Sequence, residues 1–195
     1  MSTPIEEQLV KSLQEAHALE EQAIKLLDKG ATIAGDDEIG AIYRAHLLQT
    51  KEHERYVAER LQAHDAKPSR VRDAALQGGA LGIGLALQAA PDTPARLATA
   101  AFAFENLEIA TYRLLRGLSE RAGDDETTAV VERILEQEEA AAELVAGSFE
   151  RALEHTLGEP AESRLPGVTP IGKPSERPPE ESVTPHPGPQ AARQA

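Results

Sequence analysis

The chain has 195 residues, a formal net charge of −13 and no cysteine, which excludes disulfides, thiolate metal sites and thiol catalysis. Hydrophobic residues make up 41% of it but aromatic residues only 3%, so Ala and Leu dominate the apolar content and favour helix over sheet. No cluster of Lys and Arg offers nucleic acid a positive surface, no apolar run suffices to span a membrane, and no signal peptide is visible. We therefore expect a cytoplasmic protein with neither nucleic acid nor membrane as a partner.

Four long helical patterns follow one another along the chain. The first opens with a capping box, Thr3-Pro4-Ile5-Glu6, and each pattern then places apolar residues three or four positions apart. About thirty residues separate the second pattern from the third, and a short glycine-rich helix is predicted there, over 69–90. We expect the long helices over about residues 4–34, 37–66, 94–122 and 125–158.

The composition changes after residue 158. Nine of the 13 prolines lie in 159–195, with Ser, Glu and Gly between them. Such a segment cannot bury enough apolar surface to offset the entropy of ordering it, which predicts a disordered tail. The chain therefore divides into a helical domain, 1–158, and a proline-rich tail, 159–195. The tail is either a solvated extension or a docking segment for a protein partner.

An internal repeat relates the first two helices to the last two. The sequence Ala-Gly-Asp-Asp-Glu at 34–38 recurs at 122–126, and the same offset of 88 residues aligns Leu19-Glu20 with Leu107-Glu108. Each copy supplies a glycine to end one helix and aspartates to begin the next. Two short-loop hairpins joined by a long crossover have the connectivity of a ferritin-like four-helix bundle, whereas a simple up-down-up-down bundle needs no such crossover.

Several polar residues interrupt the apolar faces of these helices: Glu20, His46, Thr50, His53, Glu105, Glu108 and Glu138. An isolated ionised carboxylate in a core is very costly, so such groups must be protonated, paired or bound to a cation. Glu20 lies 14 residues before Ala34, and Thr50 lies 13 after Asp37; Glu108 and Glu138 take the equivalent places in the second hairpin. Because antiparallel helices rise equally per residue, these four positions should share one layer of the bundle.

Di-iron and di-manganese carboxylate bundles take one Glu from each of two helices and Glu-x-x-His from the other two. Glu20 and Glu108 complete the first pair, whereas the second is divided: the second helix keeps His53 and the fourth keeps Glu138. Glu105 and His17, one turn away, are further candidates. Carboxylate and imidazole ligands suit iron, manganese or zinc. The predicted metal ligands are Glu20, His53, Glu105, Glu108 and Glu138; the alternative is a set of salt-bridged or solvated groups.

At these residues the chain resembles the YciE/YciF-type ferritin-like proteins, a bacterial family linked to stress responses. The strongest match is Phe102–Tyr112, whose last eight residues read E-N-L-E-I-A-T-Y against the family's E-H-x-E-I-A-x-Y. The segments His46–Thr50 and Gln137–Glu139 are similar to H-L-x-E-T and E-E-K. The resemblance implies a compact bundle, often a homodimer, with a dinuclear metal centre.

Three residues depart from the family pattern. Gln49, Asn106 and Gln137 stand where the family usually has Glu, His and Glu. A neutral amide is a weaker ligand for a hard cation than a carboxylate is. Binding at both positions of a dinuclear centre would therefore be weaker than in a chain with the full ligand set.

Two functions of different classes follow from these residues. The first is a metal-binding protein whose dinuclear iron or manganese centre oxidises ferrous iron or consumes oxygen or peroxide during stress, with Tyr112 as a nearby electron donor or acceptor. The second is a metal-free helical module with a structural or interaction role, docking through its tail. Iron storage in a ferritin cage is a weaker third, because the sequence identifies no cage-forming surface and carries an extra crossover and a bulky tail.

Overall fold

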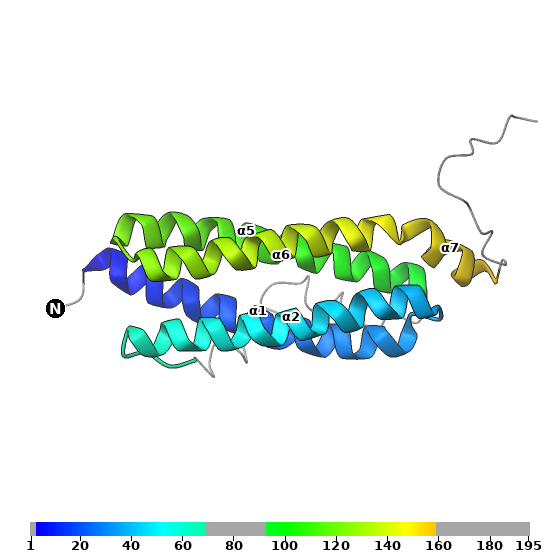
Figure 1. Ribbon diagram of the computed structural model, residues 1–195, viewed down its shortest axis with the longest axis horizontal. Coiled ribbons are helices and arrows are strands. Elements are labelled where there is room, and N and C mark those ends of the chain that lie inside the picture. Colours follow the sequence, from blue (N-terminus) through cyan, green and yellow to red (C-terminus); the bar gives the residue numbers. More distant parts are fainter. Residues whose placement is uncertain (1–2, 69–92, 159–195) are drawn as a thin grey trace, which may run out of the picture. The chain divides into compact units, whose positions relative to one another are not determined.

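A computed structural model of the chain describes residues 3–68 and 93–158. Their helices are α1 (Pro4–Ile33), α2 (Asp37–Ala63), α5 (Pro94–Ala122), α6 (Asp125–Gly147) and α7 (Phe149–Leu157), and no strand occurs in these two ranges (Figure 1). The predicted all-α class is therefore confirmed. The predicted crossover helix over 69–90 and the predicted tail, 159–195, lie outside the described residues.

The four long helices pack as two antiparallel hairpins set side by side. Helices α1 and α2 form the first hairpin and α5 and α6 the second, while α1 also packs along α5 and α2 along α6 (Figure 1). Gly30, near the end of α1, lies against Leu97, near the start of α5; a Cβ at Gly30 would come within 3.3 Å of a Leu97 methyl group. Because α1 and α2 are antiparallel, α2 ends at one end of the bundle and α5 begins at the other. This is the ferritin-like connectivity that the long crossover predicted.

The two Ala-Gly-Asp-Asp-Glu segments form equivalent turns. Gly35 and Gly123 adopt left-handed φ angles of 69° and 71°, which glycine accepts without steric cost. Asp36 caps α2 by accepting from the backbone N–H groups of Glu38 and Ile39, at 2.9 and 3.0 Å. Asp124 caps α6 by accepting from the backbone N–H of Thr127 at 3.0 Å. In each hairpin the repeated segment thus supplies the glycine of the turn and the aspartate that caps the next helix. The offset of 88 residues therefore relates two structurally equivalent turns.

Each capping aspartate is also held by an Arg and a His four residues apart on another helix. Asp124 contacts Arg60 at 3.1 Å and His64 Nε2 at 2.7 Å, both from the end of α2. Asp36 contacts Arg151 at 3.1 Å and His155 Nε2 at 3.0 Å, both from α7. We call these two arrangements the Asp124 clamp and the Asp36 clamp.

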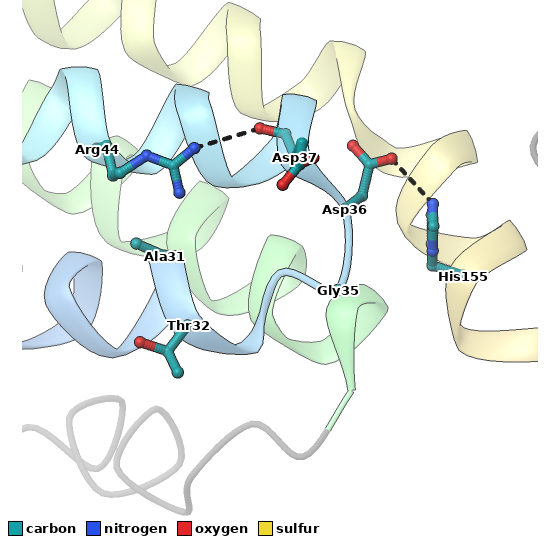
Figure 2. Close-up of a pocket in the computed structure, with 7 residues that line it drawn as sticks. All are labelled: Ala31, Thr32, Gly35, Asp36, Asp37, Arg44 and His155. Atoms are coloured by element: carbon teal, nitrogen blue, oxygen red, sulfur yellow. Dashed lines mark hydrogen bonds and ion pairs between the residues drawn. The ribbon is translucent and has the colours of Figure 1, made fainter.

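Figure 2 shows Asp36 and His155 of the Asp36 clamp beside a pocket of about 460 Å³ at the turn between α1 and α2. His155 reaches the Asp36 carboxylate from one side, and the Arg44 guanidinium donates to the backbone carbonyl of Asp37 at 3.4 Å on the other. The Asp36 carboxylate and the Arg44 guanidinium therefore both have partners at the edge of this pocket.

The fourth predicted helix is interrupted. The sequence predicts one helix from near Asp125 to Gly158, but the structure ends α6 at Gly147 and begins α7 at Phe149. Between them, the Ser148 hydroxyl donates to the carbonyl of Val145 at 2.7 Å, a local bond that competes with the helical pattern. The change of direction lets α7 bury Ala152 and bring Arg151 and His155 to Asp36.

The apolar core forms two clusters, one in each half of the bundle. One includes Leu27, Tyr43 and Leu97, and the other includes Leu13, Leu61 and Leu115. On α2 and α5 the two clusters are separated by polar positions that the sequence placed in one layer, because Thr50 lies between Leu47 and Val57, and Glu108 between Phe104 and Ile109. No helix within the described ranges is both long and apolar enough to pass through a membrane.

Candidate metal centre

Six ionisable side chains from all four long helices converge between the two apolar clusters. Helix α1 provides Glu20, α2 provides two imidazoles, α5 provides two carboxylates and α6 provides Glu138. None of the six is more than 3% exposed. We call this set the central layer; it consists of Glu20, His46, His53, Glu105, Glu108 and Glu138.

One side of the central layer brings together Glu20, His53 and Glu138, whose ligand atoms all lie within 4.8 Å of one another. His53 Nδ1 is 2.8 Å from Glu138 Oε1 and 3.8 Å from Glu20 Oε1. Neither His53 Nδ1 nor Glu138 Oε1 has a hydrogen-bond partner among the described residues, because the two atoms are close but not aligned for such a bond. Both atoms are thus left without a hydrogen-bond partner at a place where a third group could contact them.

The other side brings together His46, Glu105 and Glu138, again with ligand atoms within 4.8 Å. His46 Nε2 lies 3.0 Å from Glu105 Oε2 and 3.4 Å from Glu138 Oε2. Glu138 therefore turns one oxygen toward each histidine. This places it between two groups of three possible ligands, the position that a carboxylate shared by two cations would occupy.

Glu108 is the least compensated group of the layer. Its side chain is completely buried, and neither of its carboxylate oxygens has a hydrogen-bond partner among the described residues. Burial, followed by the charges of Glu138 and Glu20, raises the pKa of Glu108 well above its usual range. A buried carboxyl without partners is rare in folded proteins and calls for a proton or a cation.

Three further groups of the layer, Glu20, Glu105 and His46, have raised pKa values. Burial, reinforced by Glu138, raises the pKa of Glu20 well above normal even though the Tyr112 hydroxyl donates to its Oε1. Burial also raises the pKa of Glu105 to about 7. Burial opposes charge on His46, but its contacts with Glu105 and Glu138 outweigh that and raise its pKa to about 11.

Glu138 is the one carboxyl of the layer whose pKa falls. Burial favours its neutral form, but the adjacent imidazoles of His46 and His53 outweigh burial and lower the pKa below its usual range. Without a metal, the layer therefore pairs an ionised Glu138 with a cationic His46, while Glu20 and Glu108 hold their protons more firmly than an exposed carboxyl does. These protons occupy the oxygen atoms that a cation would otherwise bind.

Of the five sequence-predicted ligands, Glu20, His53, Glu105 and Glu138 belong to the two groups of possible ligand atoms, whereas Glu108 is buried under the charges of Glu138 and Glu20 but belongs to neither group. The structure adds His46, which was noted on the apolar face but not chosen as a ligand. The available signal was its spacing, because His46 lies seven residues, or two turns, before His53 and so shares its face.

Two other candidates turn away from the layer. His17 directs Nε2 to Glu54, at 2.8 Å, and so leaves the group that its position one turn from Glu20 suggested. Thr50 donates its hydroxyl to the backbone carbonyl of His46 at 3.0 Å. With His46 and Glu105 included, the layer nevertheless contains four carboxylates and two imidazoles, the numbers found in dinuclear carboxylate bundles.

Comparisons with known proteins agree with this fold. The family model described as "Domain of unknown function (DUF892)" matches residues 4–157. A protein from Xanthomonas campestris, XCC3681, is 25% identical with a TM-score of 0.66, over 80% of this chain and 97% of its own. The Escherichia coli stress protein YciF is 22% identical with a TM-score of 0.66, over 82% of this chain and 100% of its own.

A third similar structure is a two-domain protein from Anabaena variabilis with a DJ-1/ThiJ/PfpI-like and a ferritin-like domain. It is 14% identical with a TM-score of 0.58, over 88% of this chain and 42% of its own. These likenesses confirm the ferritin-like fold expected from the connectivity.

Proposed function

Because the chain belongs to the DUF892 family, as its resemblance to YciF-type proteins predicted, and buries six converging carboxylates and imidazoles, we propose that it binds two divalent transition-metal ions in its central layer. The observation that carries this proposal is Glu108, a fully buried carboxyl with no hydrogen bond to either oxygen among the described residues. A cation shared with neighbouring carboxylates would compensate it.

The two groups of ligands assign a role to each residue. His53 and Glu20 would hold one ion, His46 and Glu105 would hold the other, and Glu138 would be shared between them. Glu108 would complete the set from α5. Four carboxylates balance the charge of two divalent cations, so the filled layer would be neutral, which a buried site requires.

Iron and manganese suit this mixture of oxygen and nitrogen ligands, and either would supply one-electron redox chemistry toward oxygen or peroxide. The protein's own contribution is to exclude water, because Glu20, His53, Glu108 and Glu138 have no exposed surface. Tyr112 donates a hydrogen bond to Glu20 and so holds a proton at the edge of the layer. A role in stress defence accords with the description of the Escherichia coli relative as a stress protein.

The second candidate function, a metal-free structural or interaction module, has one observation in its favour. His46 already pairs with Glu105 and lies near Glu138, so part of the layer is compensated without a metal. This pairing does not reach Glu108, and it leaves one oxygen of Glu20 without a hydrogen bond among the described residues. The metal-binding function accounts for more of the layer.

The deciding experiment measures manganese bound after dialysis by the wild type and by two matched variants. Glu138→Gln removes the shared ligand, whereas Glu139→Gln makes the same change at the next residue, which forms a surface ion pair with Arg113 at 2.7 Å. We expect an exchange-coupled manganese pair, visible by electron paramagnetic resonance, in the wild type and in Glu139→Gln but not in Glu138→Gln. A wild type that retains no manganese, or equal retention by both variants, would contradict the proposal. Oxygen uptake on addition of ferrous iron would then test for redox activity.

A further inference from the structure

Two of the residues that depart from the family pattern lie directly against the histidines of the central layer. Gln137 Oε1, on α6, is 2.6 Å from His53 Nε2. Gln49 Oε1, on α2, is 3.3 Å from His46 Nδ1. The repeat aligns Gln49 with Gln137, so each hairpin provides one amide oxygen to one imidazole.

An amide oxygen only accepts hydrogen bonds, so the ring nitrogen that faces it must carry the hydrogen. In a neutral imidazole the other nitrogen then has a free electron pair. For His53 that other nitrogen is Nδ1, which faces Glu138 and Glu20. For His46 it is Nε2, which faces Glu105 and Glu138. Opposite ring nitrogens face the layer in the two histidines, yet in each case the glutamine lies at the other one.

We propose that Gln137 and Gln49 are positioning residues that accept from the outer ring nitrogens of His53 and His46, so that the layer-facing nitrogens bind the cation; at His46 the arriving cation displaces the proton on Nε2. This inference rests on the proposed function, because it concerns the orientation of two of the proposed ligands. Metal-bound histidines generally donate their second N–H to such an acceptor, which fixes both the tautomer and the ring orientation.

An amide accepts this hydrogen bond without adding charge. Both glutamines are only partly buried, yet each contacts a histidine that is no more than 3% exposed. A carboxylate there would add negative charge beside a layer that two divalent cations already neutralise. Asn106, the third departure, provides a contrast: its side-chain amide donates to the Phe102 carbonyl of its own helix at 2.7 Å and is exposed. The replacement of family residues by amides is therefore not by itself enough to create such a contact.

The test uses the metal-free full-length chain with nitrogen-15-labelled histidine at pH 8, where an ordinary imidazole is neutral. Nitrogen chemical shifts distinguish a protonated ring nitrogen from a free one. We expect Nε2 of His53 to be protonated and Nδ1 to be free in the wild type. Gln137→Met should lose this preference, Gln137→Glu should retain it through a carboxylate acceptor, and Gln22→Met should have no effect. Gln22 is a matched control because it is also half-buried but donates to the Ala18 carbonyl of its own helix.

A zinc titration then measures the consequence for binding, since zinc is diamagnetic and leaves the spectra readable. We expect Gln137→Met to bind zinc about 10–100-fold more weakly than the wild type, as is typical when such a partner of a ligand is removed. Gln137→Glu and Gln22→Met should bind within a few-fold of the wild type. A wild-type His53 protonated at Nδ1, or a tautomer unchanged in Gln137→Met, would overturn the inference. If the expected tautomers are found but the wild type binds neither zinc nor manganese, the positioning role stands and the metal function fails.

Discussion

Replacing Glu108 with methionine separates what this residue does for stability from what it does for metal binding. Methionine has a similar length and no hydrogen-bonding group, so it can fill the same buried space without an unpaired polar atom. Leaving a buried polar group without a partner costs about 1–3 kcal/mol. We therefore expect the free energy of unfolding of the metal-free Glu108→Met variant to be higher than that of the wild type by about 1–3 kcal/mol. For a domain of this size that raises Tm by about 2–12 °C.

With manganese present, the difference in free energy of unfolding between Glu108→Met and the wild type should become smaller or change sign. A ligand at a hundredfold excess over its Kd stabilises the folded state by about 2.7 kcal/mol. The wild type should gain this stabilisation and the variant should gain much less, because the variant lacks one of the proposed ligands. Urea denaturation followed by circular dichroism, in EDTA and in manganese chloride, gives both comparisons.

The matched control is Glu136→Met, which makes the same substitution at an exposed position of α6. This control should change the free energy of unfolding by less than about 0.5 kcal/mol in either solution. If metal-free Glu108→Met has the wild-type helical content but is less stable than the wild type by more than about 1 kcal/mol, then Glu108 makes a stabilising contact and the reasoning is wrong.

Three further predictions concern pH, caps and turns. Because the pKa of Glu105 is raised to about 7 and those of Glu20 and Glu108 are raised well above their usual range, metal binding should release protons. Manganese affinity should therefore fall as pH falls below 7, and calorimetry in buffers of different ionisation enthalpy measures the proton release. Burial would raise the pKa of Asp124, but Thr127, His64 and Arg60 outweigh it and lower the pKa from 3.8 to about 2. The stabilisation from a lowered carboxyl pKa is fully present above pH 3.8 and is lost as pH falls toward 2. Asp124→Asn should therefore lower the free energy of unfolding by about 2 kcal/mol at pH 7 but change it little at pH 2, as measured by denaturant titration. Gly123→Ala should lower the free energy of unfolding by about 1 kcal/mol, because alanine strains at a φ of 71°; a variant as stable as the wild type would contradict this.

Much of the fold could be predicted because the repeat aligns equivalent positions of the two hairpins. One offset located both turns, and equal rise per residue placed Glu20, Thr50, Glu108 and Glu138 at one height. The break at Ser148 could not be predicted in this way, because it depends on whether a serine hydroxyl bonds to its own helix or to water.

The composition of the central layer was harder to predict than its height. Height along a helix does not say which way a side chain turns, and the difference between His46 and His17 depends on neighbours from other helices. His46 meets Glu105 of α5, whereas His17 meets Glu54 of α2 outside the layer. The glutamines were interpreted from sequence only as weaker ligands. The contact of Gln137 with His53 requires the geometry of both hairpins, whereas the contact of Gln49 with His46 lies within α2, three residues apart.

The two aspartate clamps connect the hairpins reciprocally. Arg60 and His64, from the first hairpin, hold the turn of the second through Asp124, while Arg151 and His155, after the second hairpin, hold the turn of the first through Asp36. Neither hairpin can swing away from the other without breaking the contacts at both ends of the bundle. The proposed ligands come from both hairpins, so an ion could leave only when the hairpins separate. The clamp contacts therefore oppose release of the ion. A metal ion in the proposed site should therefore exchange on the slow timescale of bundle opening.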